Sequence, residues 1–154
     1  MARSYYSTVF DQSADAVWRV IRDFNNYPVW VDGAGESEIE EGRPGDAVGA
    51  IRNVFYNGSR RRQKLLALSD IERTQVYGFE GAAPMPVWNL QATIRVTPVI
   101  DGDRAFIEWF ATFDCDPEGQ DERIVVLRDA FAGWLGSLRR HLDGVKPPSS
   151  SRAA

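Results

Sequence analysis

The chain has 154 residues, of which 44% are hydrophobic and 26% charged, a composition typical of a soluble globular domain with a sizeable core. Its formal net charge of −4 argues against a nucleic-acid-binding domain, because such domains carry a basic surface. The single Cys and single His cannot form an internal disulfide or a His- or Cys-rich metal site, so we expect no metal and no cofactor. No stretch is apolar enough to span a membrane and no signal peptide is visible at the start, so we expect a cytoplasmic protein.

The first third of the chain predicts one strand followed by two short helices. Residues 4–10 predict the strand, and Ser13 is a suitable N-cap for a helix whose apolar face includes Val17 and Trp18. Pro28 disfavours helix at the residue before it and ends this helix region. A second short helix or turn is expected over residues 27–31.

The middle of the chain predicts several strands in succession, separated by turns rich in Gly, Pro and Asn. These strands are expected at residues 36–41, 47–56, 63–69 and 75–79. The short basic run Arg60-Arg61-Arg62 is interpreted as a solvated strand entry. A longer loop, residues 81–86, precedes the last pair of strands.

The last third predicts a long hairpin and a long helix. Apolar Trp88, Leu90 and Ala92 alternate with polar residues, the pattern of a strand with one dry face and one wet face. Asp101-Gly102 is a strong hairpin signal, and a second strand is expected at 104–113. An amphipathic helix over 120–142 follows. Six consecutive strands argue for antiparallel pairing, and we therefore expect an α+β domain over residues 1–143 with a disordered tail at 144–154.

These segments carry a resemblance to a known superfamily. The matching segments are Ala16-Val17-Trp18, Ile21-Arg22-Asp23-Phe24, Gly49-Ala50-Ile51-Arg52, Lys64-Leu65-Leu66-Ala67-Leu68, Ala92-Thr93-Ile94-Arg95-Val96 and Ile107-Glu108-Trp109. Over residues 4–142 the chain resembles the SRPBCC (START-like) superfamily, and within it the bacterial polyketide cyclase/dehydrase branch. The resemblance implies a helix-grip fold, in which a seven-stranded antiparallel sheet wraps around the long C-terminal helix and two short helices follow the first strand.

The fold implies a cavity between the sheet and the last helix, and strand alternation suggests which side chains line it. The five Trp fit either an aromatic core or an aromatic-lined pocket. Two apolar stripes run along the last helix: Leu127, Phe131, Leu135 and Leu138 form one, and Val126, Ala130 and Trp134 form the other. One stripe is expected to anchor the helix and the other to line the cavity; the alternative is that both belong to the core. The expected apolar lining consists of Tyr77, Phe79, Trp88, Leu90, Ala92, Phe106, Phe110, Ala130 and Trp134.

Three polar residues are expected to converge inside this cavity. Composition favours an inward Trp109 and a solvated Glu108, but the resemblance to plant abscisic-acid receptors places a pocket glutamate at Glu108, and we adopt the inward Glu108. The resemblance to lachrymatory-factor synthases matches their arginine to Arg52 and puts Gln63 where they have a glutamate. A glutamine does not titrate near neutral pH, so it supports recognition rather than acid–base chemistry.

The favoured function is therefore binding of a small, largely apolar ligand bearing one or two oxygens, by a carrier or sensor. The alternative is a polyketide cyclase, aromatase or isomerase that uses Glu108 as acid or base together with Arg52. A structural protein with a packed interior is the third possibility. The expected partner is a small apolar or amphipathic molecule, with no nucleic acid and no integral membrane association, and the protein is expected to be a monomer or homodimer.

Overall fold

The computed structural model describes residues 1–144, and the tail expected at 144–154 lies outside these residues except for Gly144, which ends the last helix. Eleven elements follow one another in the chain. They are β1 (Ala2–Phe10), α1 (Ala14–Ile21), α2 (Tyr27–Trp30), β2 (Ala34–Ile39), the 3₁₀ helix η1 (Glu40–Gly42), β3 (Ile51–Tyr56), β4 (Ser59–Ser69), β5 (Thr74–Phe79), β6 (Trp88–Val99), β7 (Arg104–Asp114) and α3 (Gln120–Gly144).

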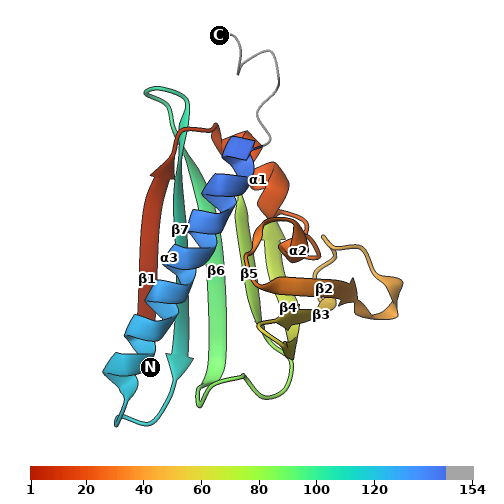
Figure 1. Cartoon of the computed structure of the whole chain (residues 1–154), viewed down its shortest axis with the longest axis vertical. Helices are drawn as coiled ribbons and strands as arrows, with labels where there is room; N and C mark the ends of the chain where they lie inside the picture. The colour runs from red at the N-terminus through yellow and green to blue at the C-terminus, as the bar shows by residue number, and fades with distance from the viewer. Residues whose placement is uncertain (145–154) are drawn as a thin grey trace.

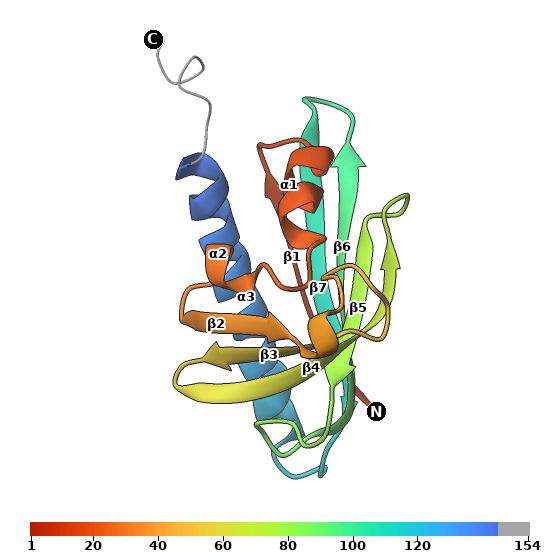
Figure 2. The same cartoon turned by 90° about the vertical axis from the view of Figure 1, so that its right-hand side faces the viewer.

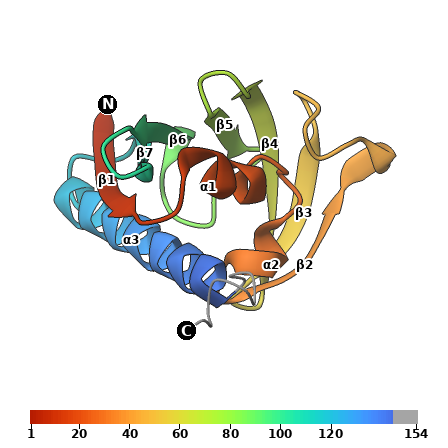
Figure 3. The same ribbon diagram turned by 90° about the horizontal axis from the view of Figure 1, so that it is seen from above.

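The seven strands form one antiparallel sheet in the order β1-β7-β6-β5-β4-β3-β2. The sheet curls so strongly that β2, β3 and β4 run crosswise to β6 and β7 (Figure 2). The long helix α3 lies along the concave side against β1 and β7 (Figure 1), and α1 and α2 occupy the same side (Figure 3). The predicted helix-grip fold is confirmed.

The helix α3 is held to the sheet by one apolar stripe. Its buried apolar residues recur at intervals of three and four, the spacing of one helical face, and they are Leu127, Phe131, Leu135, Leu138 and Leu142. Val126, the first residue of the other stripe, is 50% exposed. The first stripe therefore anchors the helix in the core.

The turn between β3 and β4 is tighter than the sequence reading suggested. Asn57 and Gly58 have φ values of 49° and 81°, which suit a two-residue hairpin turn, and Tyr56 pairs with Ser59 across it. As a result β4 begins at Ser59 and the basic run at 60–62 is part of the strand. Alternation then sends neighbouring arginines of this run to opposite faces of the sheet.

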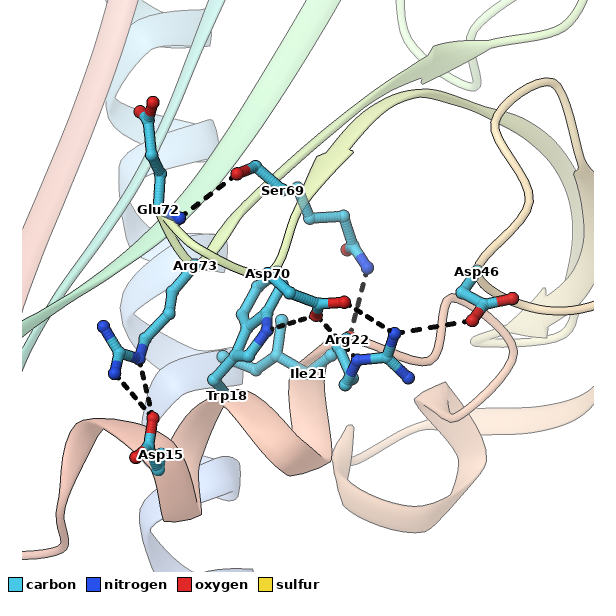
Figure 4. Close-up of polar contacts among 10 residues, drawn as sticks. Asp15, Trp18, Ile21, Arg22, Asp46, Ser69, Asp70, Glu72 and Arg73 are labelled. Carbon is cyan, nitrogen blue, oxygen red and sulfur yellow. Dashed lines mark hydrogen bonds and ion pairs between the residues drawn. The ribbon is translucent and has the colours of Figure 1, made fainter.

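A polar network fixes α1 to the turn between β4 and β5 (Figure 4). Asp70 accepts hydrogen bonds from Trp18 Nε1 at 2.8 Å and from Arg22 Nε and Nη2 at 2.8 and 3.0 Å. Gln75 on β5 donates to the carbonyl oxygen of Ile21 at 3.1 Å. These contacts hold the end of α1 over the end of the sheet where β4 turns into β5.

Candidate functional site

The most unusual interior group is the guanidinium of Arg52 on β3, which is 1% exposed. Antiparallel pairing places Gln63 of β4 directly opposite, and Arg52 Nε donates to Gln63 Oε1 at 2.7 Å. Arg52 Nη1 donates to the carbonyl oxygen of Phe24, in the segment after α1, also at 2.7 Å. Arg52 and Gln63 thus meet inside the fold, as predicted.

Aromatic rings rather than carboxylates surround this guanidinium. Its central carbon lies 3.6 Å from the ring centre of Tyr27, 3.8 Å from that of Phe24 and 5.3 Å from that of Tyr77. No salt bridge within residues 1–144 includes Arg52. Burial therefore lowers the pKa of Arg52, while cation–π contacts compensate part of the lost hydration.

Two buried tyrosines extend the polar cluster toward β7. Tyr77 OH accepts a hydrogen bond from Trp109 Nε1 at 3.2 Å, and it lies 3.5 Å from Tyr27 OH. Burial raises the pKa of Tyr77 well above its ordinary value, so its hydroxyl remains neutral. Tyr77 was predicted to line the site, whereas Tyr27 was missed because it lies in a four-residue helix without a readable periodicity.

The prediction of an inward Glu108 is wrong. On β7 the inward position belongs to Trp109, which is fully buried, so alternation places Glu108 on the outer face. There Glu108 Oε1 accepts a hydrogen bond from Tyr5 OH at 2.8 Å. Phe106 and Phe110 share this outer face and do not line the interior either. Burying a large indole costs much less than burying a carboxylate, and this difference sets the register.

Arg61 is a second, partly buried arginine on the inner face, at a position where we expected a solvated residue. It pairs with Val54 of β3, a fully buried residue, and stands two positions from Gln63, so all three share the inner face. Its guanidinium carbon lies 4.7 Å from the ring centre of Tyr56, and burial lowers the pKa of Arg61. Arg61 could have been identified from the sequence, because it lies two residues before Gln63 and alternate residues of a strand share one face.

Aromatic side chains occupy the centre of the space between the sheet and α3. Phe131 stacks on Trp109 with ring centres 5.2 Å apart, and Trp134 lies 5.1 Å from Trp109. Trp134 Nε1 donates to Tyr56 OH at 2.7 Å. Trp134 and Ala130 also line a groove of about 490 Å³ on the outer side of this cluster.

A second cavity, of about 460 Å³, lies beneath the loop between β5 and β6. Its lining consists of Phe79, Gly81, Ala82, Ala83, Met85, Val87, Trp88, Asn89 and Leu90. Phe79, Trp88 and Leu90, which were predicted to line a cavity together, all belong to this lining. A β-bulge with Asn89 at φ 54° leaves Trp88 51% exposed. Ala92, further along β6, is buried in the core and does not contribute to this lining.

A third and smaller cavity adjoins the second. It has a volume of about 190 Å³, is lined in part by Arg61, and shares Phe79 and Ala82 with its larger neighbour. The two cavities therefore share part of their walls, and Arg60, Arg61, Arg62 and Glu80 bring charged groups to the smaller one.

Comparison with known families identifies the chain. Residues 1–146 match the model of a family described as polyketide cyclase/dehydrase and lipid transport. The chain belongs to this family. The predicted SRPBCC resemblance is thereby confirmed. A comparison with curated protein sequences finds no match.

Solved structures of similar proteins agree with membership of the cyclase/dehydrase and lipid-transport family. A Thermobifida fusca protein shares 27% identity and a TM-score of 0.82, covering 95% of this chain and 96% of that one. The Bacillus cereus protein XoxI shares 26% identity and a TM-score of 0.80, covering 92% and 96%. One more match is to the di-domain aromatase/cyclase BexL, from the BE-7585A biosynthetic pathway. It shares 17% identity and a TM-score of 0.79 over 93% of this chain and 47% of BexL, a likeness of fold alone.

The interior of this family member supplies hydrogen-bond donors and aromatic surfaces. Its polar groups are two guanidinium groups, two tyrosine hydroxyls and the amide of Gln63, all of which can donate hydrogen bonds. Within residues 1–144 no group of His, Cys, Asp and Glu is arranged to hold a metal ion, and no helix is long and apolar enough to cross a membrane. This arrangement is suited to binding and polarising an oxygen group.

Proposed function

We propose that the protein binds a small, largely apolar molecule bearing one or two oxygens, as a carrier or sensor. The ligand's apolar part occupies the cavity beneath the β5–β6 loop, and its oxygens reach the polar cluster of Arg52, Gln63 and Tyr77. The observation that carries this proposal is the guanidinium of Arg52, buried among aromatic rings without a carboxylate partner. A buried charge without a counterion is costly, and an oxygen-bearing ligand lowers that cost.

The dimensions of the cavity support a small ligand. Its volume of about 460 Å³ lies within the usual range of roughly 300–1,000 Å³ for small-molecule sites. Its lining combines Phe79, Leu90 and Met85 with backbone from the loop. The aromatic cluster of Trp109, Phe131 and Trp134 contributes no side chain to this lining.

Binding can be tested with the neutral fluorescent dye Nile red and with cavity-filling variants. Ala83→Trp fills the cavity, whereas Ala67→Trp adds the same side chain at an exposed position of β4. We expect Nile red to bind the wild type and Ala67→Trp, and to lose binding in Ala83→Trp. Equal binding by all three proteins would contradict a site beneath the loop. Native mass spectrometry of protein purified from its own host would identify the class of any bound molecule.

A second candidate function is that of a cyclase, aromatase or isomerase, which membership of the family favours. Glu108 lies on the outer face of the sheet, so it cannot act as an acid or base inside the fold. In an enzyme of this kind Arg52 would polarise a substrate carbonyl, with the hydroxyls of Tyr27 and Tyr77 nearby as hydrogen-bond partners. Turnover of a poly-β-keto substrate that Arg52→Met abolishes would favour this candidate over simple binding.

A further inference from the structure

Three buried nitrogen atoms have no hydrogen-bond acceptor among residues 1–144. They are Trp30 Nε1, Arg52 Nη2 and Arg61 Nε. All three are donors, and no buried side-chain oxygen of the described residues lacks a partner. Buried donors are normally paired, because an unmet donor costs roughly 1–3 kcal/mol. The described interior therefore has more buried hydrogen-bond donors than acceptors to pair with them.

The two arginines lie close together on one face of the sheet. Arg52 stands opposite Gln63, and Arg61 is two residues from Gln63 along β4, so the arginines are diagonal neighbours. Diagonal neighbours on one face of an antiparallel pair lie about 7–8 Å apart, within reach of long side chains. One small group can therefore contact both guanidinium groups.

Trp30 belongs to the same region through Tyr27. Its ring centre lies 5.3 Å from that of Tyr27, and the guanidinium carbon of Arg52 lies 3.6 Å from the same tyrosine ring. Trp30 and Arg52 are both at least nine-tenths buried, whereas Arg61 is partly buried and also lines the small cavity beside Phe79. Trp30 and Arg52 thus flank the same tyrosine, and Arg61, diagonal to Arg52 on the sheet, is the donor that also lines a cavity.

The charge of this region is mainly positive, and Glu80 is a carboxylate that shares the small cavity with Arg61. Neither Arg52 nor Arg61 takes part in an ion pair within residues 1–144. The adjacent Arg62 points outward and pairs with Glu40 at 2.8 Å. The carboxylates that pair with arginines in this protein are therefore on the outside, and the inside has two positive charges.

We propose that the ligand is an amphipathic acid, whose anionic carboxylate accepts hydrogen bonds from Arg52, Arg61 and Trp30 while its apolar body occupies the cavity beneath the loop. This inference rests on the proposed function and specifies the ligand class. A carboxylate is an acceptor-only group, and arginine binds it with particular strength through parallel N–H donors. A neutral alcohol or amide supplies fewer acceptors and no charge.

The test compares acids with neutral analogues of the same shape. Decanoate and 1-decanol form one pair, and 2-naphthoate and 2-naphthamide form another, each titrated against bound Nile red as the reporter. We expect the acid to bind about ten-fold or more tightly than its neutral analogue, the usual worth of a charge-assisted hydrogen bond. Equal affinity within both pairs would overturn the inference and leave the proposed function standing. Absence of binding by Nile red and all four compounds would instead overturn the proposed function, and this inference with it.

An exposed arginine outside the cavities provides a control of equal charge. Arg61→Gln and Arg19→Gln make the same change of charge, but Arg19 is exposed on α1 and lines none of the cavities described above. We expect Arg61→Gln to weaken binding of the acid about ten-fold while leaving that of the neutral analogue unchanged, and Arg19→Gln to alter neither. Trp30→Phe, which removes only the indole donor, should weaken acid binding in the same selective way. Equal effects of Arg61→Gln and Arg19→Gln would refute the assignment, and circular dichroism checks that each variant is folded.

Discussion

Truncating Phe131 to alanine tests whether the aromatic cluster between the sheet and α3 is the core of the fold. Phe131 is 2% exposed, and its ring lies nearly parallel to that of Trp109, with an interplanar angle of 12° and ring centres 5.2 Å apart. The ring of Trp134 is 6.0 Å away on the same helix. The variant removes the side chain that joins the helix to the centre of the sheet.

The free energy of unfolding that Phe131→Ala is expected to lose is a large part of the total for a domain of this size. A fully buried Phe→Ala change costs about 3–5 kcal/mol, of which roughly 0.5–1.5 kcal/mol reflects aromatic stacking beyond burial of area. A domain of this size has a total stability of about 5–15 kcal/mol, so the variant remains folded near room temperature in most of this range. At about 2–4 °C per kcal/mol, the midpoint of thermal unfolding should fall by roughly 6–20 °C.

Urea unfolding followed by far-UV circular dichroism measures this loss of free energy. Val126→Ala is the control, since Val126 lies on the same helix but is 50% exposed, and such a change costs within about 0.5 kcal/mol. If Phe131→Ala lost no more than Val126→Ala, the assignment of the aromatic cluster to the core would be refuted.

Other variants test single contacts. Trp134→Phe keeps an aromatic ring but removes the donor to Tyr56, so stability should fall by about 0.5–1.5 kcal/mol in urea unfolding, and an unchanged midpoint would count against that bond. The bonds to Asp70 lower the pKa of its carboxyl from 3.8 to about 2, so the ionised form stabilises the fold above pH 4 and this contribution is lost as the pH falls toward 2. Asp70→Asn should therefore be less stable than the wild type at pH 6 and equal to it near pH 2, whereas a constant difference would exclude the linkage. Gln63→Glu places a carboxylate beside Arg52 and should weaken binding of decanoate, as measured by Nile red displacement, while leaving 1-decanol unaffected.

Regular patterns made the fold predictable. The hairpin of β6 and β7, the tight turn at Asn57-Gly58 and the helical spacing of α3 are local signals that each point to the observed element. The resemblance then supplied the arrangement of these elements, which no single segment encodes. The bulge beside Trp88 was not predictable, because the apolar and polar residues of the sequence alternate without a break from Trp88 to Val96.

The site was only partly predictable because alternation gives two faces without saying which is inside. On β7 composition pointed to Trp109, and the resemblance to a distant relative pointed to Glu108; burial energy decided for the indole. Arg52 and Gln63 were placed correctly, but Arg61 was hidden within a basic run that normally indicates solvent. Tyr27 contributes through tertiary packing alone, which sequence periodicity cannot reveal.

The hydrogen-bond network around Asp70 makes the two ends of the curved sheet differ in how firmly they are held. It fastens α1 to the turn between β4 and β5, while the loop between β5 and β6 lies at the other end of the same strand β5. One end of β5 is therefore fixed to α1 by the charged bonds to Asp70, whereas the other end continues into a loop rich in Gly, Ala and Pro. Changes in the length or bulk of that loop would alter the cavity beneath it without disturbing the bonds to Asp70, so the dimensions of the cavity and the stability of the fold can vary independently.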